Sequence, residues 1–327
     1  MASEPALLVT GGVGFVGSHF ARAAVAAGRK VVLLDDLSGG AQPPLPVPPG
    51  ATLVRGDIGD AELVTRLCRE HAVEALVHFA GKIQVGESVA RPELYFDVNL
   101  VRSLALLQAV LACGVRQVVF SSTAAVYGVP TQVPIPETAP TVPVNPYGCA
   151  KLAFEWALHS YQVAHGLRWA ALRYFNAAGA HPDGTLGENH RPETHLIPLV
   201  LDAGLWRGPP LTVFGTDYPT ADGTCVRDYI HVCDLARAHL LALDRLAAGE
   251  VVGPLNLGSG HGYSVREVLA AAAELLGHPV PHSTGPRRAG DPPALVAAPT
   301  QAQIKLGFIA ERSSLPELLQ DALRARR

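Results

Sequence analysis

The sequence predicts an α/β protein with a doubly wound parallel sheet, followed by a smaller C-terminal α/β domain. In the first half of the chain, short β-branched runs alternate with helical patterns, which is typical of a parallel sheet covered by helices on both faces. From about Asn176, connections rich in glycine and proline separate shorter elements. We therefore expect one domain over residues 1–175 and a second over residues 176–327, with a segment near residues 226–246 that can pack back on the first domain.

The expected strands of the first domain are short apolar runs bounded by turn residues or polar residues. In chain order they are Ala6–Thr10, Lys30–Leu34, Thr52–Arg55, Ala75–Phe79 and Gln117–Ser121. Longer patterns between the strands predict helices over Val16–Ala27, Ala61–His71 and Pro92–Cys113. In the second domain we expect a helix near Ile197–Gly204, a strand over Leu211–Phe214 and a helix near Val265–Leu276.

The composition is that of a globular protein. Of 327 residues, 48% are hydrophobic and 17% are charged, and the formal net charge is −3. Because no block of like charges occurs, neither nucleic acid nor a membrane surface is expected as a partner. The N-terminus lacks the pattern of a signal peptide, and no apolar stretch approaches the ~20 residues that span a bilayer. The five cysteines are scattered, as expected for reduced thiols, so we expect a cytoplasmic protein.

Three glycines, Gly11, Gly14 and Gly17, follow the first predicted strand and begin the first predicted helix. Glycines in this spacing allow a tight turn and let backbone N–H groups approach a pyrophosphate at the positive end of the helix. The pattern predicts a Rossmann dinucleotide-binding domain. Asp35 closes the second predicted strand, where a carboxylate can accept from ribose hydroxyls and repels a 2′-phosphate. NAD is therefore favoured over NADP, with a simple turn role for Asp35 as the alternative.

Asp57 and Ile58 follow the third predicted strand, where the edge of an adenine ring would lie. Asp57 can also cap the helix that follows, and one side chain can serve both purposes.

Tyr147 and Lys151 lie four residues apart in Asn145-Pro-Tyr-Gly-Cys-Ala-Lys. Pro146 fits the first position of a helix with Asn145 as its cap, so both side chains should lie on one side of that helix. A phenol has a pKa near ~10 and is a poor base at neutral pH. The Lys151 ammonium, the positive helix start and a nicotinamide ring should all lower this pKa, which makes Tyr147 a plausible acid and base for an alcohol.

Thr123 follows the last predicted strand of the first domain, at the sheet edge where ligands bind, and its hydroxyl can bond to the same alcohol oxygen. Taken singly, each of these side chains has an ordinary structural explanation. Together with the glycine motif, Thr123, Tyr147 and Lys151 predict nicotinamide-dependent redox chemistry on an alcohol. Cys225, His231 and Cys233 are close in sequence but lack metal-ligand spacing, so we expect no metal site.

Further motifs are spread over nearly the whole chain. They are Thr10–Gly17, His78–Gly81 followed by Val85–Ser88, Phe120–Gly128, Leu172–Asn176, Phe214–Thr220, Val226–Val232 and Pro286–Asp291. On these motifs the chain resembles the extended short-chain dehydrogenase/reductase family, and within it the UDP-hexose 4-epimerases. The segment Gly215–Gly223 before Val226–His231 is the part most specific to the epimerases.

The resemblance, together with the glycine motif, implies a cofactor site for NAD. Its residues would be Gly11, Gly14, Phe15, Val16, Gly17, Asp35, Asp36, Leu37, Ser38, Asp57, Ile58, Phe79, Ala80, Gly81, Lys82, Asn99, Thr123, Tyr147, Lys151 and Phe175. Lys82 and Asn99 would lie near the nicotinamide, and Phe175 beside its ring.

The resemblance also implies a site for a UDP-sugar. Its residues would be Thr123, Tyr147, Asn176, His195, Leu196, Thr212, Val213, Phe214, Arg227, Arg288, Asp291 and Leu295. Two arginines suit a diphosphate, and Asp291 suits ribose hydroxyls, although an exposed ion pair is the alternative for Arg288 and Asp291. Leu295 would lie beside C2 of the sugar, or would simply pack in the small domain. His195 stands where some relatives have asparagine, which keeps a hydrogen-bond donor.

The activity implied by the resemblance is reversible inversion at C4 of UDP-galactose and UDP-glucose through a 4-keto sugar. Alternatives are a related activity on UDP-N-acetylhexosamines, a nucleotide-sugar 4,6-dehydratase, or an NAD-binding sensor without catalysis. By the same resemblance, dehydratases of this family place acidic residues just after the position of Thr123. Ala124 and Ala125, which cannot transfer protons, therefore argue against the dehydratase.

The resemblance further implies a homodimer through the helices near Pro92–Cys113 and Pro146–His165. Four apolar positions on the first of these helices would serve either the core or that interface: Leu104, Leu107, Val110 and Leu111.

Overall fold

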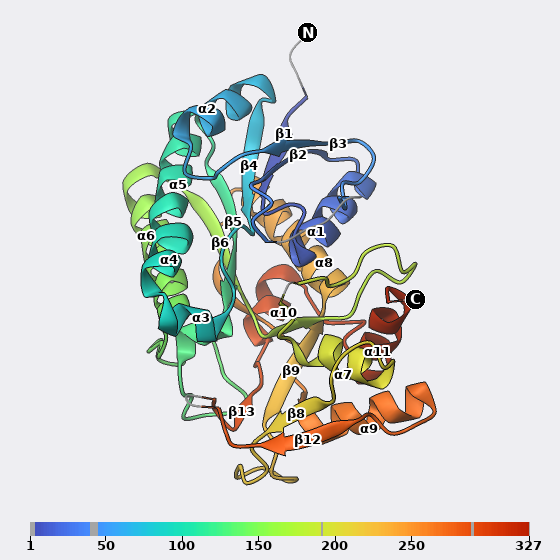
Figure 1. Cartoon of the computed structure of the whole chain (residues 1–327). Helices are drawn as coiled ribbons and strands as arrows, with labels where there is room; N and C mark the ends of the chain where they lie inside the picture. The colour runs from blue at the N-terminus through green and yellow to red at the C-terminus, as the bar shows by residue number, and fades with distance from the viewer. Residues whose placement is uncertain (1–3, 40–44, 191, 289–290, 327) are drawn as a thin grey trace.

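The computed structural model describes residues 4–39, 45–190, 192–288 and 291–326. Its centre is a seven-stranded parallel sheet with the strand order β10-β6-β5-β4-β1-β2-β3 (Figure 1). These strands are β1 (Ala6–Thr10), β2 (Lys30–Asp35), β3 (Ala51–Arg55), β4 (Val73–His78), β5 (Gln117–Thr123), β6 (Arg168–Tyr174) and β10 (Gly253–Leu257). The chain reverses its direction of winding between β1 and β4, and ligands bind beyond the strand ends at such a point. The predicted doubly wound sheet is confirmed.

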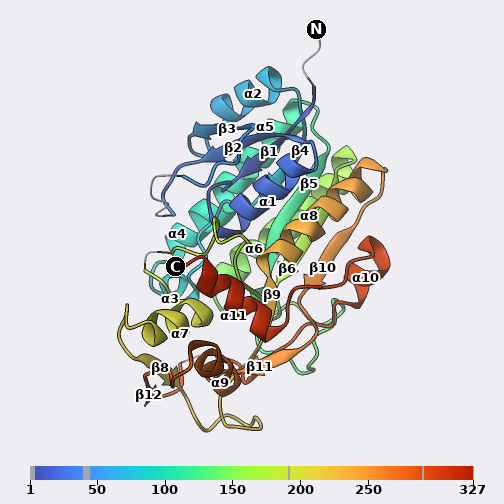
Figure 2. The same ribbon diagram turned by 90° about the vertical axis from the view of Figure 1, so that its right-hand side faces the viewer.

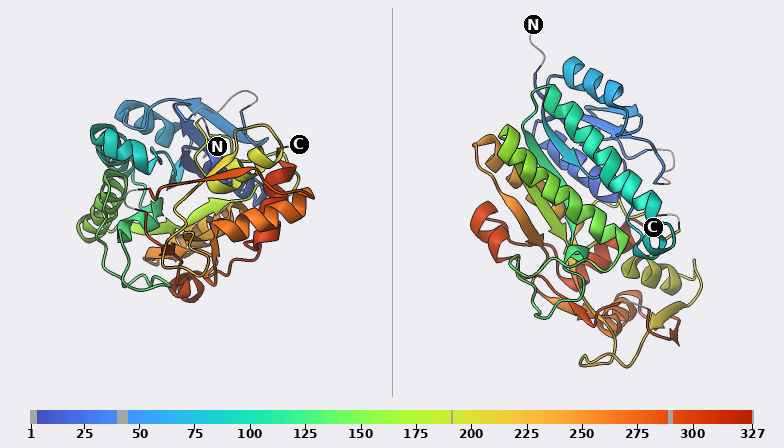
Figure 3. Two further views of the ribbon diagram at one scale, coloured as in Figure 1. Left: turned by 60° about the horizontal axis from the view of Figure 1, so that its bottom comes forward. Right: turned by 90° about the vertical axis from the view of Figure 1, so that its left-hand side faces the viewer.

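Successive residues of β1 face opposite sides of the sheet, as the alternation of a strand requires. Leu7 and Val9 belong to the core under the helices α1 (Phe15–Ala26), α8 (Val232–Ala247) and α10 (Thr300–Leu306). Leu8 belongs to the core under α2 (Ala61–Glu70), α5 (Ser103–Ala112) and α6 (Pro146–His165). Figure 2 shows α1 beside α8 on the first face, and the right-hand view of Figure 3 shows the helices of the other face.

The remaining elements lie mostly in a smaller part beyond the carboxyl ends of the strands (Figure 1). They are α3 (Val85–Ala90), α4 (Pro92–Phe96), the 3-10 helix Ala124–Tyr127, β7 (Asn176–Ala178), α7 (Leu196–Gly204), β8 (Leu211–Phe214), β9 (Val226–His231), β11 (Gly262–Ser264), α9 (Val265–Leu276), β12 (His282–Gly285), β13 (Ala294–Leu295) and α11 (Leu315–Arg324). Strand β9 pairs with β7, β11 and β13, and β8 pairs with β12. The helices α7, α9 and α11 share a third apolar core.

Three segments beyond Asn176 belong to the large sheet and its cover, namely α8, β10 and α10. Helix α8 packs against α1, and β10 pairs with β6 at the edge of the sheet. The strand β10 lies outside the segment near residues 226–246 that was expected to pack on the first domain. Its return was not predicted, because the short run Gly253–Leu257 does not differ in pattern from the strands of the smaller part. That residues 176–327 form a substrate-binding unit stays a prediction.

The predicted helix over Pro92–Cys113 is interrupted. It consists of α4, a π-helical segment over Asp97–Arg102, and α5. The whole run Pro92–Ala112 has 21 residues and a mean hydropathy of 1.4 in its most apolar window, so one described helix is long and apolar enough to cross a membrane. The expectation that no stretch approaches that length is therefore wrong. Its side chains Leu106, Leu107 and Val110 are fully buried against the sheet, as in the core helix of a globular protein.

Candidate functional site

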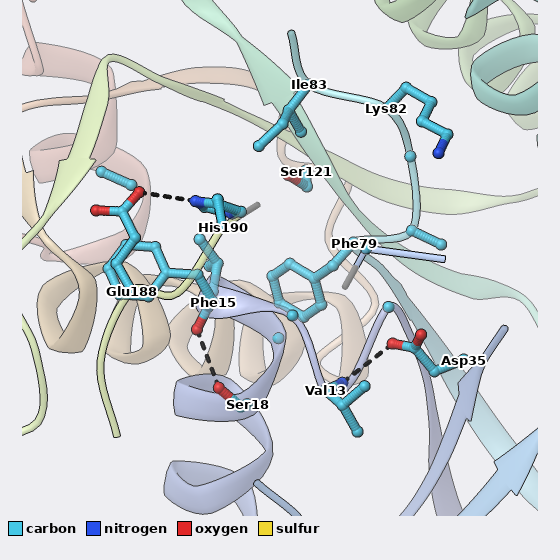
Figure 4. Close-up of a pocket in the computed structure, with 18 of the residues that line it drawn as sticks. Val13, Phe15, Ser18, Asp35, Phe79, Lys82, Ile83, Ser121, Glu188 and His190 are labelled. Atoms are coloured by element: carbon cyan, nitrogen blue, oxygen red, sulfur yellow. Dashed lines mark hydrogen bonds and ion pairs between the residues drawn. The ribbon is translucent and has the colours of Figure 1, made fainter. Parts of the chain in front are cut away.

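A cavity of about 1100 Å³ opens beyond the carboxyl ends of the large sheet. Its walls come from the turn after β1, the ends of β2 to β6, the start of α6, the loop before α7 and the end of α11. Figure 4 shows Val13 and Asp35 on one side of this cavity, with Glu188 and His190 on the other and Phe79 between them. The cavity therefore lies at the point where the winding of the sheet reverses.

The glycine-rich turn is shaped by close backbone contacts. Gly11 has a φ of +68°, and a Cβ atom there would meet the backbone nitrogen of Ala80 at 2.6 Å. A Cβ atom at Gly17 would meet the carbonyl oxygen of Gly11 at 2.1 Å. A Cβ atom at Gly14 would have one close neighbour, the Gly11 oxygen at 3.3 Å. Gly11 thus packs the turn against the segment that follows β4, and Gly17 packs the start of α1 against the turn. The N-terminus of α1 stays open to the cavity, which suits a pyrophosphate.

Asp35 both shapes its turn and lines the cavity. Its carboxylate accepts from the backbone N–H of Val13 at 3.1 Å, drawn in Figure 4, and from that of Leu37 at 2.9 Å. Burial raises the pKa of Asp35, and these two backbone hydrogen bonds act in the opposite direction. A carboxylate has about four acceptor sites, so it retains capacity for ribose hydroxyls.

Asp57 also lines the cavity, but it is not the cap of the helix that follows. The cap of α2 is Asp60, whose side chain accepts from the backbone N–H of Leu63 at 3.0 Å. Asp57 instead accepts from the N–H of Gly59 at 2.7 Å and forms an ion pair with Arg102. The capping alternative for Asp57 is therefore wrong.

The start of α6 has the expected form. The Asn145 side chain accepts from the N–H of Gly148 at 2.9 Å, and Pro146 occupies the first turn. Tyr147 and Lys151 both line the cavity, one turn apart. Lys151 is 3% exposed, and its ammonium donates to the carbonyl oxygen of Ser121 at 3.0 Å.

Thr123 is the last residue of β5, two residues beyond the predicted end of that strand. Its Oγ1 accepts from the N–H of Ala125 at 3.1 Å, so the hydroxyl proton is free to be donated. The structure therefore brings Thr123, Tyr147 and Lys151 together in one wall of the cavity.

The electrostatics of this group differ from the expectation. Burial raises the pKa of the Tyr147 phenol, although a hydrogen bond with Thr123 acts to lower it. Burial also lowers the pKa of Lys151 to about 8. The protein's own groups thus raise the pKa of the phenol, and the predicted lowering by Lys151 and the helix start is wrong. Desolvation of the buried phenol is the largest influence on its pKa and outweighs the hydrogen bond with Thr123.

Asn99 supports the cavity wall from behind. It lies in the π-helical segment and is 1% exposed. Its Oδ1 accepts from the N–H of Lys82 at 2.7 Å, and its Nδ2 donates to the carbonyl oxygen of Lys82 at 2.9 Å. Asn99 therefore fixes the backbone of the segment Phe79–Lys82, which lines the cavity, but it does not itself line it.

The other predicted cofactor residues all line the cavity: Phe15, Val16, Asp36, Leu37, Ser38, Ile58, Phe79, Ala80, Gly81, Lys82 and Phe175. Among the predicted substrate residues, Asn176 and His195 line it as well. The rest of the predicted substrate set lies outside this cavity, in the smaller part: Leu196, Thr212, Val213, Phe214, Arg227, Arg288, Asp291 and Leu295.

Several of those outlying residues contact one another. Arg227 donates to Asp291 Oδ1 at 3.1 Å, and the Arg288 guanidinium lies 4.2 Å from the centre of the Phe214 ring. The alternative that Arg288 and Asp291 form an ion pair with each other is thus wrong, because Asp291 pairs with Arg227. Leu295 packs beside the apolar cluster that contains Phe175, which links it to the cavity wall.

The cavity wall also contains residues that the sequence did not single out, including Glu188, His190 and Arg326. Glu188, His190, Glu193 and His195 occur within eight residues, and this density of charged and imidazole side chains was an available signal.

The fold and the cavity define a dinucleotide-binding α/β protein with a tyrosine and lysine pair of the short-chain dehydrogenase/reductase type. The glycine turn, the open start of α1 and Asp35 fit an NAD molecule, as described above. The chain belongs to the NAD dependent epimerase/dehydratase family, whose model matches residues 7–258.

Individual relatives are similar over nearly the whole chain. The UDP-glucose 4-epimerase of Azospirillum brasilense is 50% identical, over 98% of this chain and 92% of that protein. The crystal structure of UDP-glucose 4-epimerase from Brucella ovis in complex with NAD is 46% identical, with a TM-score of 0.93 and 98% of both chains covered. That of the Bifidobacterium longum enzyme in complex with NAD+ and UDP is 38% identical, with a TM-score of 0.91 and the same coverage.

Proposed function

We propose that this chain catalyses the NAD-dependent, reversible inversion at C4 of UDP-galactose and UDP-glucose through a 4-keto sugar. The observation that carries the proposal is the placement of Thr123, Tyr147 and Lys151 in one wall of a cavity that begins at the glycine-rich turn. The relatives described above are UDP-glucose 4-epimerases, an isomerase activity, and they match this chain from end to end.

The residues that would hold NAD follow the cavity from the glycine-rich turn to β6. The turn and the start of α1 would receive the pyrophosphate, Asp35 would accept from the adenosine ribose, and Asp57 would lie near the adenine. Phe175 would lie beside the nicotinamide, and Asn99 would act through the Lys82 backbone that it fixes. When bound, NAD supplies a group that accepts a hydride and returns it.

The protein's own residues move the proton. Tyr147 takes the proton from the sugar O4 as the alcohol becomes a ketone, and returns it when the ketone is reduced. The Thr123 hydroxyl, whose oxygen is already bonded to the Ala125 N–H, donates to O4 and holds it near the phenol. Burial raises the pKa of Tyr147, and the positive charge of bound NAD would act in the opposite direction and favour the phenolate.

Inversion requires that the ketone present its other face before it is reduced. The nucleotide must therefore be held firmly and the sugar loosely. We assign the firm part to Asn176, His195, the residues of β8, Arg227, Arg288 and Asp291. Binding of UDP would replace the contact between Arg227 and Asp291 by contacts of each with the ligand.

The dehydratase alternative is disfavoured by the residues after Thr123. Ala124 and Ala125 form the 3-10 helix Ala124–Tyr127 and carry no group that transfers protons. Activity on UDP-N-acetylhexosamines depends on the space near C2 of the sugar, for which Leu295 is the candidate residue.

The oligomer and the location of the protein are also part of the proposal. Leu107, Val110 and Leu111 are buried in the core of one subunit, so they are not available for an interface. Other apolar side chains on α4 to α6 are exposed instead: Phe96, Val101, Trp156 and Val163. We propose a homodimer through this face, and the cytoplasm as the location because all five cysteines are free thiols.

The direct test is to incubate the purified protein with UDP-galactose and NAD, release the sugar with mild acid and identify it. The proposal expects glucose, and galactose when the reaction is started from UDP-glucose. A 6-deoxy-4-keto sugar would instead identify a dehydratase, and unchanged galactose would identify a protein that only binds.

A further inference from the structure

The loop before α7 carries a group of two carboxylates and two imidazoles: Glu188, His190, Glu193 and His195. Three of them, Glu188, His190 and His195, line the cavity, and Glu188 and His190 are visible in Figure 4. The reaction described above uses no proton from these side chains. Their arrangement points to a second task.

The ring nitrogen Nδ1 of His195 faces two carboxylate oxygens. It lies 2.7 Å from Glu188 Oε1 and 3.2 Å from Glu193 Oε1. Glu193 Oε1 also accepts from the backbone N–H of His195 at 2.9 Å, which fixes it in place. An unprotonated Nδ1 would set its lone pair against both carboxylates, so Nδ1 carries a proton.

The protonation of the other nitrogen, Nε2, then decides what His195 offers to the cavity. In a neutral imidazole protonated at Nδ1, Nε2 is a bare acceptor that repels an anion, whereas in the imidazolium it is a donor. Burial lowers the pKa of His195, but the hydrogen bonds and charges of Glu188 and Glu193 outweigh it and raise that pKa to about 10. Burial in turn raises the pKa of Glu188, and its bonds to His190 and His195 outweigh this and lower it to about 2.

The surroundings of Nε2 favour an anion. The His195 side chain is 41% exposed, while that of Glu188 behind it is 3% exposed. His195 immediately precedes α7, a helix of nine residues whose first backbone N–H groups have no partner within the helix. Within the described part of the chain, the hydrogen bonds and ion pairs of this ring all involve Nδ1, and the His190 ring lies beside it with 5.1 Å between the ring centres.

We propose that Glu188 and Glu193 are positioning residues that keep His195 as a fixed hydrogen-bond donor to the diphosphate of the nucleotide sugar. This inference rests on the proposed function, because it takes a nucleoside diphosphate sugar as the ligand. The glycine-rich turn and the start of α1 serve the diphosphate of NAD, so the start of α7 is left for that of the sugar nucleotide.

A divalent metal is the competing explanation for such a group. One ligand atom from each of the four side chains lies within 4.8 Å of the others. However, ligand atoms on tetrahedral zinc are about 3.3 Å apart, since each is about 2.0 Å from the metal. The 2.7 Å between Glu188 Oε1 and His195 Nδ1 is shorter, and it is the distance of a charge-assisted hydrogen bond. The hydrogen-bonded arrangement is therefore favoured, and the expectation of no metal stays a prediction.

The test measures binding of UDP-glucose by calorimetry, with saturating NAD and EDTA, between pH 6.5 and 9. All proteins carry Tyr147→Phe so that no turnover occurs. With both glutamates present, the dissociation constant should stay within twofold over this range. With Glu188→Gln and Glu193→Gln together, the pKa of His195 should fall back towards its ordinary value, and binding should weaken about tenfold or more by pH 9, as expected for a lost bond to a charged group. Glu193→Gln alone should give a smaller effect in the same direction and serves if the double variant does not fold.

Two comparisons separate positioning from a general structural effect. In a His195→Asn background, a neutral amide donates at every pH, so adding Glu188→Gln should leave the pH profile flat. The matched control is Glu62→Gln, an exposed carboxylate on α2 that does not line the cavity, which should leave the profile unchanged.

Three results would overturn the inference in distinct ways. A flat profile in the glutamine variants, with affinity equal to that of the Tyr147→Phe protein, would remove the positioning role. One bound divalent metal per chain, lost with Glu188→Gln and needed for UDP-glucose binding, would replace it by a cation site. If the Tyr147→Phe protein with both glutamates fails to bind UDP-glucose at every pH, the proposed function itself fails.

Discussion

Replacing Lys151 by methionine should change how the stability of the protein depends on pH. The Lys151 ammonium is 3% exposed, and burial lowers its pKa from 10.5 to about 8. That difference corresponds to about 3–4 kcal/mol of unfolding free energy, at about 1.4 kcal/mol for each pKa unit. The single hydrogen bond to the Ser121 oxygen opposes this shift without offsetting it.

The sign follows from where the proton is held. Below pH 8 the lysine is charged in both states, so the folded protein bears the whole cost of burying the charge. Between pH 8 and 10.5 the unfolded chain still holds the proton that the folded protein has released, and stability rises with pH. Between pH 7 and 10, the free energy of unfolding of the parent should therefore rise by about 2–3 kcal/mol relative to that of the methionine variant.

Urea unfolding of both proteins, stripped of NAD, at steps from pH 7 to 10 measures this difference. Lys305→Met is the matched control, because Lys305 also donates to a backbone carbonyl oxygen, that of Val252 at 2.7 Å, but lies on the surface. Its stability should follow that of the parent at every pH. Parallel curves for the parent and Lys151→Met would refute the argument that burial sets the charge of Lys151.

Three further substitutions test the site. Tyr147→Phe should lower kcat by ~10²–10⁴-fold while NAD stays bound, and a variant within threefold of the parent in a coupled assay for UDP-glucose would remove the acid and base assignment. Asp35→Ala should weaken NAD binding and reduce the preference for NAD over NADP, as measured by fluorescence titration of both cofactors. A parent protein that binds NADP as well as NAD would contradict our interpretation of Asp35. Leu295→Tyr should suppress activity on UDP-N-acetylgalactosamine more than on UDP-galactose, because pocket size discriminates by ~1–3 kcal/mol, and equal losses of kcat/KM on the two substrates would falsify that role.

The sequence predicted correctly those features that depend on a few neighbouring residues. The glycine spacing fixed the turn after β1, and Asn145 with Pro146 fixed the start of α6, so Tyr147 and Lys151 were placed correctly on one side of a helix. Each of these features depends on the backbone conformation of a few neighbouring residues.

Properties that depend on tertiary contacts were not accessible in the same way. The pKa of Tyr147 depends on how completely the folded chain removes water from the phenol, and spacing carries no measure of this. The strand β10 pairs with β6, which lies far away in the sequence, and the pattern of Gly253–Leu257 does not indicate which strand it pairs with. The sequence did not identify Glu188 and Glu193 as site residues, because their role depends on the contact of both carboxylates with the His195 ring nitrogen in the folded chain.

The central claim is that oxidation and reduction at C4 take place within one cavity, with Tyr147 moving only the proton of O4. UDP-galactose carrying deuterium at C4 tests this most directly, with the product followed by proton NMR in ordinary water. The account predicts UDP-glucose that keeps the deuterium at C4, because the hydrogen leaves carbon as a hydride and returns without exchange. Loss of the deuterium to solvent would contradict it, since that result requires a proton, and not a hydride, to be removed from C4.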